Sequence, residues 1–254
     1  MTVLLSFFFF GAIVASFVGV LVARLHTGAS FFTGRSRCDA CNAPLSPLAL
    51  VPVVSYLASG GRAQCCGARI SLAAPLTELL LGGLFVLAYL HVRFSSVLLL
   101  LLLSLSILLA LVLYDLSHQI LPPTLLAAFI VAAAATGFLS APSPTVFLEE
   151  LLAALLIAGS LALVHLLSRG RAMGFSDAPL AFGLALLAGR AALPGLMFSF
   201  WIGAVIGIAI LLKRPVGSRM GVEVPFAPFL AAGFLLAYFT QWNPFAFVAA
   251  LSGA

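Results

Sequence analysis

Two aspartates stand at the ends of long apolar runs, where an acidic side chain is costly and is therefore a functional candidate. Asp115 ends one run in the stretch 113–122, and Asp177 opens another in the stretch 172–180. An acidic residue at membrane depth costs about 2.5–3.5 kcal/mol on insertion scales. If the two carboxyl groups lie close together, one keeps a proton while the other is ionised, so the pair could activate water and polarise a carbonyl. This arrangement predicts peptide hydrolysis; the alternative is two helix-end aspartates that face interfacial water.

The four cysteines of the chain form the second candidate site. Cys38 and Cys41 make a CxxC pair, and Cys65 and Cys66 follow after 23 residues. The distribution of basic residues, given below, indicates that this segment is cytosolic, where thiols stay reduced. A CxxC pair with a distant second pair has the spacing of a tetrahedral zinc site. Four protein ligands leave no open position, so the predicted zinc is structural. The alternative is a loop without metal that carries free thiols.

The spacing of the second cysteine pair is irregular. Asn42 and Gly67 follow the second cysteine of each pair and fit the positive φ of a zinc knuckle. A regular second knuckle would place its first cysteine at position 63, which is Ala63. The side chains of the adjacent residues Cys65 and Cys66 should diverge, so both could bind one metal only if the chain makes an unusual turn. We therefore expect either three or four thiolates at the site.

Other polar residues in the apolar runs have less specific interpretations. Glu78 lies about one turn inside the second run, where it is either interfacial or functional. His118 is three residues after Asp115 on the same helical face, so it could tune that carboxylate, but we interpret it as an interfacial residue. We interpret His165 as an interfacial or packing residue.

The composition determines the kind of protein that must position these groups. Of 254 residues, 63% are hydrophobic and only 7% are charged, against about 25% charged in a soluble domain. We predict an all-α polytopic membrane protein with a first helix at 1–23, a cytoplasmic cysteine segment at 24–72 and a membrane domain at 73–254. Apolar runs predict about eight spans, near 3–23, 73–91, 95–114, 123–141, 147–167, 176–193, 195–213 and 225–250. The last run holds either one helix broken near Trp242-Asn243-Pro244 or a helix followed by an apolar tail.

Basic residues indicate the orientation of the spans. With the N-terminus outside, ten of the twelve Lys and Arg residues fall in cytoplasmic segments, and only Arg93 and Arg190 fall outside. Both aspartates then lie at cytoplasmic helix ends. The net charge of +5 reflects this topology, so no nucleic-acid partner is needed to explain it, and membrane lipid is the expected surrounding.

The order of the motifs resembles the bacterial type IV prepilin peptidases, which are also called leader peptidase/N-methyltransferases. The resemblance covers nearly the whole chain. It is carried by eight motifs in order: 16–25, 36–41, 51–57, 66–71, 75–79, 115–122, 173–177 and 224–230. The run Met173-Gly174-Phe175-Ser176-Asp177 resembles the GxGD motif of that family of intramembrane aspartic proteases.

The resemblance implies a specific activity. Such enzymes cut the short basic leader from precursors of type IV pilins and pseudopilins at the cytoplasmic membrane face, in pilus and type II secretion systems. Many members then methylate the new N-terminus with S-adenosylmethionine. Asp115 and Asp177 match the two catalytic aspartates, and the cysteines match the zinc-binding segment. The expected location is the bacterial inner membrane.

Four positions depart from the family pattern and indicate a divergent member. Ser176 replaces the second glycine of GxGD, Pro179 replaces a frequent lysine, and Pro123 replaces a frequent acidic residue; Ala63 is the fourth. None of them removes a candidate catalytic aspartate. Two other functions fit the same residues: a proton-coupled membrane transporter, and a catalytically idle membrane scaffold for pilus or secretion assembly.

Overall fold

The computed structural model describes residues 1–25, 37–38, 40–46, 50–171, 173–213 and 224–244. The described part is all-helical apart from two isolated β-bridges, as the composition predicts. It divides into two compact units, Met1–Leu98 and Leu99–Ala254. Some residues that the sequence analysis relies on lie outside the described ranges: positions 36 and 39 of the motif 36–41, residue 172, three of the counted basic residues (Arg35, Arg214 and Arg219) and the end of the last predicted span.

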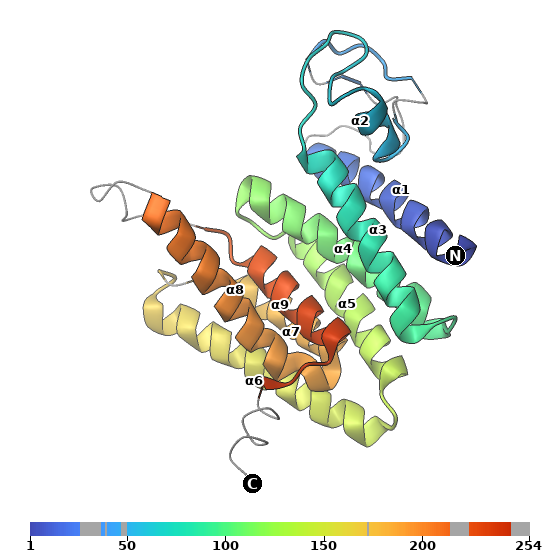
Figure 1. Ribbon diagram of the computed structural model, residues 1–254. Coiled ribbons are helices and arrows are strands. Elements are labelled where there is room, and N and C mark those ends of the chain that lie inside the picture. The colour runs from blue at the N-terminus through green and yellow to red at the C-terminus, as the bar shows by residue number, and fades with distance from the viewer. Residues whose placement is uncertain (26–36, 39, 47–49, 172, 214–223, 245–254) are drawn as a thin grey trace. The chain divides into compact units, whose positions relative to one another are not determined.

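The first unit contains two long helices and the cysteine segment between them. Helices α1 (Thr2–Arg24) and α3 (Ala73–Val92) lie side by side, and α2 (Val54–Ala58) is a short turn of helix (Figure 1). Glycines allow the two long helices to approach closely: a Cβ atom on Gly11 would lie 2.7 Å from the carbonyl oxygen of Leu81. Small residues have this role in membrane helix pairs.

The second unit is built around α7 (Asp177–Ala188). This 12-residue helix contacts α5 (Pro123–Ser140), α6 (Pro144–Ser168), α8 (Ala192–Lys213) and α9 (Ala227–Thr240), and ten of its residues are buried. Helix α4 (Ser96–His118) begins at the boundary between the units. The helix that begins with Asp177 is therefore held from several sides.

The helix ends follow from local sequence. Pro123 is the first residue of α5, where its missing N–H needs no partner, and the Ser143 side chain caps α6 by accepting from the Val146 N–H. Helix α7 ends before Gly189, which has a φ of +54°, and a single 3₁₀ turn (Gly189–Ala191) leads into α8.

The exposed side chains are largely apolar, which is what lipid contact requires. Large residues such as Leu99, Val131 and Leu156 are exposed on the helices. Six helices in the described residues are long and apolar enough to cross a membrane when Asp177–Lys213 is taken as one stretch. The chain is therefore a multi-pass membrane protein.

The number of spans differs from the eight that the sequence predicted. The predicted spans 176–193 and 195–213 correspond to α7 and α8, but α7 rises only about 18 Å, against about 30 Å of hydrocarbon. In the last predicted span, 225–250, α9 has 14 residues and stops before Gln241, whose φ is +53°. Hydropathy does not locate the end of α7, whereas α9 ends beside the break predicted near Trp242-Asn243-Pro244.

Candidate active site and cysteine cluster

Asp115 lies in the last turn of α4, three residues before the helix ends at His118. Its side chain is only 7% exposed, and it accepts a hydrogen bond from the backbone N–H of Ala227, the first residue of α9. Its Oδ2 atom is buried and has no hydrogen-bond partner among the described residues. A buried polar atom of this kind is rare and is commonly explained by function.

Asp177 is the first residue of α7 and is also 7% exposed. The backbone N–H of Gly174 donates a hydrogen bond to its carboxylate. Because Asp177 lies at a helix N-terminus, the partial positive charge of that helix end also favours a negative side chain. The carboxylate is therefore stabilised by two groups: the Gly174 N–H of the preceding loop and the N-terminus of α7.

The two aspartates lie close enough in the second unit to interact electrostatically. Electrostatic repulsion acts between the Asp115 and Asp177 carboxylates. The end of α4 and the starts of α7 and α9 therefore converge, although the three segments are far apart in the sequence. Two buried carboxyl groups with different surroundings thus lie in one region of the second unit.

Two further residues of this region were not assigned to the site from the sequence. Ala227 supplies only its backbone N–H, so no side-chain signal could have identified it, although the motif 224–230 contains it. His165, interpreted above as an interfacial or packing residue, interacts electrostatically with Asp177 and hydrogen-bonds the loop before it. His118 is exposed, and its ring lies 4.4 Å from that of Tyr114.

Glu78, left open between two interpretations, is buried in the first unit. It accepts a hydrogen bond of 2.7 Å from the backbone N–H of Val53, just before α2. Val53 has a φ of +60°, a strained conformation for a β-branched residue. The carboxylate of Glu78 therefore fixes a strained turn within the cysteine segment.

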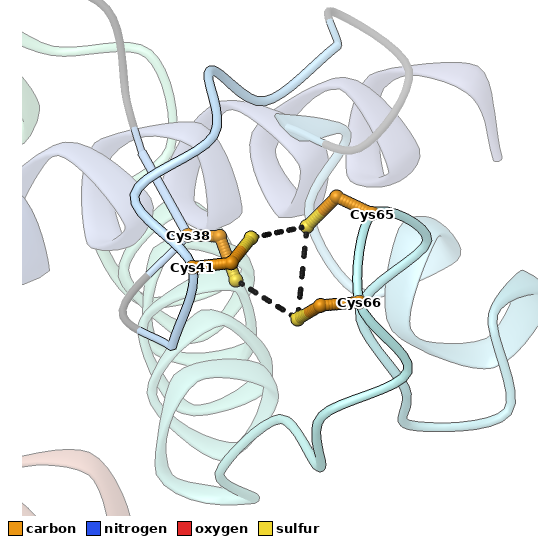
Figure 2. Close-up of side chains that lie close together, drawn as sticks. All are labelled: Cys38, Cys41, Cys65 and Cys66. Carbon is orange, nitrogen blue, oxygen red and sulfur yellow. Dashed lines mark hydrogen bonds between the residues drawn. The ribbon is translucent and has the colours of Figure 1, made fainter.

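All four cysteine sulfurs converge, as Figure 2 shows. They lie within 4.8 Å of one another; the Sγ–Sγ distances are 3.3 Å for Cys41–Cys65, 3.7 Å for Cys38–Cys66 and 3.9 Å for Cys65–Cys66. Four thiolates around zinc, with Zn–S bonds of about 2.3 Å, would be about 3.8 Å apart. The donor set and spacing therefore fit a tetrahedral metal ion, and the cluster could bind one.

The two cysteine loops have the same backbone design. The Asn42 N–H donates to the Cys38 carbonyl at 2.8 Å, and the Gly67 N–H donates to the Ala63 carbonyl at 2.7 Å. Asn42 and Gly67 have φ angles of +57° and +71°, which confirms the predicted positive φ. Ala63 of the second loop thus corresponds to Cys38 of the first, so the second loop has no thiol at that position. Its second thiol comes from Cys65, two residues further along and directly before Cys66.

The adjacent cysteines converge because they lie in a turn. Successive side chains point to opposite faces only in an extended strand, so the expected divergence of Cys65 and Cys66 does not occur here. Backbone N–H groups of Cys41 and Ala40 lower the pKa of Cys38 to about 7, whereas hydrogen bonds with Cys41 and Cys38 raise the pKa of Cys65 to about 12. The loops thus favour a thiolate at Cys38 before any metal binds.

Comparison with known proteins gives a consistent result. Residues 9–92 match the model of the bacterial peptidase A24 N-terminal domain. The chain is 31% identical over 240 residues to the prepilin leader peptidase/N-methyltransferase of Bacillus subtilis, covering 91% of this chain and 92% of that protein. It is 33% identical to the protein of the same name from Myxococcus xanthus, and the match covers 81% of this chain and 62% of that protein. It is 31% identical to the protein of that name from Legionella pneumophila, and the match covers 83% of this chain and 74% of that protein. No solved structure matches the chain.

Proposed function

Because this chain belongs to the prepilin leader peptidase/N-methyltransferase family, we propose that it hydrolyses the peptide bond after the leader of a prepilin, with Asp115 and Asp177 as the catalytic residues. The observation that carries the proposal is the approach of two buried carboxyl groups at three converging helix ends. A catalytic pair requires such an approach, whereas two independent interfacial aspartates would be solvated and apart.

The carboxyl pair supports hydrolysis by an activated water molecule. Two close carboxylates share one proton, so one group is ionised and the other is protonated. The ionised carboxylate takes a proton from water as the water oxygen bonds to the scissile carbonyl carbon, and the protonated carboxyl group donates to the carbonyl oxygen. The C–N bond then breaks as a proton passes to the leaving nitrogen. No covalent enzyme intermediate forms.

The site suits a substrate that is itself a membrane helix with a polar leader. A prepilin or pseudopilin has an apolar segment behind a basic leader, and the exposed apolar helices here provide a surface along which such a segment could lie. Ten of twelve basic residues fall in segments assigned to the cytoplasm, which supports an N-terminus outside and an active site at the cytoplasmic face of the bacterial inner membrane.

We assign a structural zinc ion to Cys38, Cys41, Cys65 and Cys66. With four thiolate ligands the ion has no open position, so it would link the two loops and take no part in hydrolysis. The names of the relatives also include N-methyltransferase, which supports S-adenosylmethionine as a cosubstrate that methylates the new N-terminus. No residue of this chain is assigned to that cosubstrate.

The proposal is tested with purified protein in detergent and a prepilin, by weighing the product. We expect the native protein to remove the leader, and Asp115→Asn and Asp177→Asn each to lower the rate about a thousandfold or more. Glu149→Gln, which removes an exposed carboxylate at the start of α6, is the matched control and should cleave normally.

Each alternative function makes a different prediction in the same assay. A scaffold leaves every prepilin intact while the protein stays folded. A transporter also leaves it intact but loses proton-coupled flux in vesicles when either aspartate is changed. Either result contradicts the peptidase assignment. A product heavier by one methyl group, formed only with S-adenosylmethionine, would establish the second activity.

A further inference from the structure

His165 lies in the last turn of α6 and contacts the loop that leads to Asp177 at several points. Its Nδ1 atom is 2.9 Å from the carbonyl oxygen of Met173, and its ring centroid is 5.5 Å from that of Phe175, edge to face. Its own carbonyl accepts from the Gly170 N–H at 2.9 Å. The side chain is half-buried, and it interacts electrostatically with Asp177.

The hydrogen bond to Met173 determines where the imidazole hydrogen is. A carbonyl oxygen can only accept, so Nδ1 must donate, and it carries a hydrogen whether the ring is neutral or cationic. The position of the ring is thus coupled to one peptide group of the loop. A histidine that only packs against lipid or headgroups has no such requirement.

That peptide group is the one that binds Asp177. The Met173 carbonyl and the Gly174 N–H belong to the same planar amide, and in a trans peptide they point in opposite directions. The imidazole N–H donates to one side of this amide, and the other side donates to the Asp177 carboxylate. Hydrogen bonds in such a chain orient and polarise one another.

We infer that His165 is a positioning residue, which fixes the Met173–Gly174 amide so that the Gly174 N–H donates to Asp177. The inference rests on the proposed function, because its consequence for catalysis requires Asp177 to be catalytic. His165 does not touch the reacting atoms. It therefore acts on the rate of the chemical step through the orientation of a carboxylate, and substrate binding should be nearly independent of it.

Three substitutions distinguish this role from simple packing. His165→Phe keeps a ring beside Phe175 but cannot donate, and we expect kcat for leader cleavage to fall about 10- to 100-fold, as it does for other groups that orient reactive side chains. KM should change less than about twofold. His165→Asn places an amide N–H near the position of Nδ1, so it should recover most of the lost rate. His91→Phe, in the last turn of α3, is the matched control.

The outcomes separate the inference from the proposed function. If Asp177→Asn abolishes cleavage while His165→Phe retains the native kcat, only the inference fails. It also fails if His165→Asn is as impaired as His165→Phe, because an N–H donor at this position would then not restore the rate, or if KM rises while kcat is unchanged. Nitrogen-15 NMR of histidine-labelled protein gives a test that needs no activity. A resonance of hydrogen-bearing Nδ1 should disappear in His165→Phe, and a neutral His165 with its hydrogen on Nε2 overturns the inference.

Discussion

Gly137 should be intolerant of even one added methyl group, because α5 and α7 approach each other there. A Cβ atom on Gly137 would lie 2.5 Å from the carbonyl oxygen of Leu186, whereas ordinary contacts begin at 3.4 Å. The difference, 3.4 − 2.5 = 0.9 Å, is the distance by which α7 would have to move, because a backbone carbonyl cannot rotate aside as a side chain can. Gly137→Ala therefore moves the helix that carries Asp177.

The expected magnitude follows from two opposing effects. Alanine raises helix propensity by up to about 1 kcal/mol relative to glycine, whereas overpacking costs about 1–3 kcal/mol. We expect Gly137→Ala to lower the free energy of unfolding by about 1 kcal/mol or more. Misplacement of a reacting group by about 1 Å can cost about a hundredfold in rate, so cleavage should fall further than stability alone explains.

Gly159→Ala provides the matched control. Gly159 is a helical glycine of α6 whose added Cβ atom would meet nothing within 4 Å, so alanine there should leave stability unchanged or increase it by up to about 1 kcal/mol. Thermal unfolding in one detergent, together with prepilin cleavage, measures both effects. If Gly137→Ala is as stable and as active as Gly159→Ala, the close packing of α5 on α7 does not position the site.

Three further changes test other parts of the structure. Cys65→Ala should reduce bound zinc, measured by elemental analysis after dialysis, and the added change Ala63→Cys should restore it because both loops share one backbone design. Ala227→Pro removes the N–H that binds Asp115, so cleavage should fall about tenfold or more, with thermal unfolding measured alongside to separate this effect from the steric cost of the ring at a buried position; normal cleavage would contradict this role of the Ala227 N–H. Glu78→Ala should destabilise the protein by about 1–3 kcal/mol by removing the acceptor for Val53, whereas Glu78→Gln should be nearly neutral.

Most helix positions could be predicted because lipid selects for length and hydrophobicity. The predicted runs 73–91 and 123–141 became α3 (Ala73–Val92) and α5 (Pro123–Ser140), within two residues at each end. The end of α7 could not be predicted in the same way, because it depends on the positive φ of Gly189, which does not interrupt the apolar composition of its run. Helix α9 ends at Thr240, just before polar residues and a proline, so its end lies close to the predicted break near Trp242-Asn243-Pro244.

The candidate site was predictable to the extent that side chains carry its chemistry. Two acidic residues in an apolar chain are conspicuous, and so are four cysteines. The remaining groups act through the main chain: the N–H of Ala227, the N–H of Gly174 and the amide that His165 binds. Any residue except proline has such a group, so only the three-dimensional arrangement shows which ones bind the carboxylates.

Dependence on main-chain donors also explains why the departures from the family motifs are compatible with an intact site. Ser176 has a φ of −66°, which any residue adopts, so the glycine of the motif is not required at this position. Pro179 is the third residue of α7, where a missing N–H interrupts no helical hydrogen bond. Both substitutions leave the Gly174 N–H and the first residue of α7 in place. The surroundings of Asp177 are therefore preserved by backbone geometry while the neighbouring side chains diverge, and the carboxylates themselves are the positions at which substitution should be least tolerated.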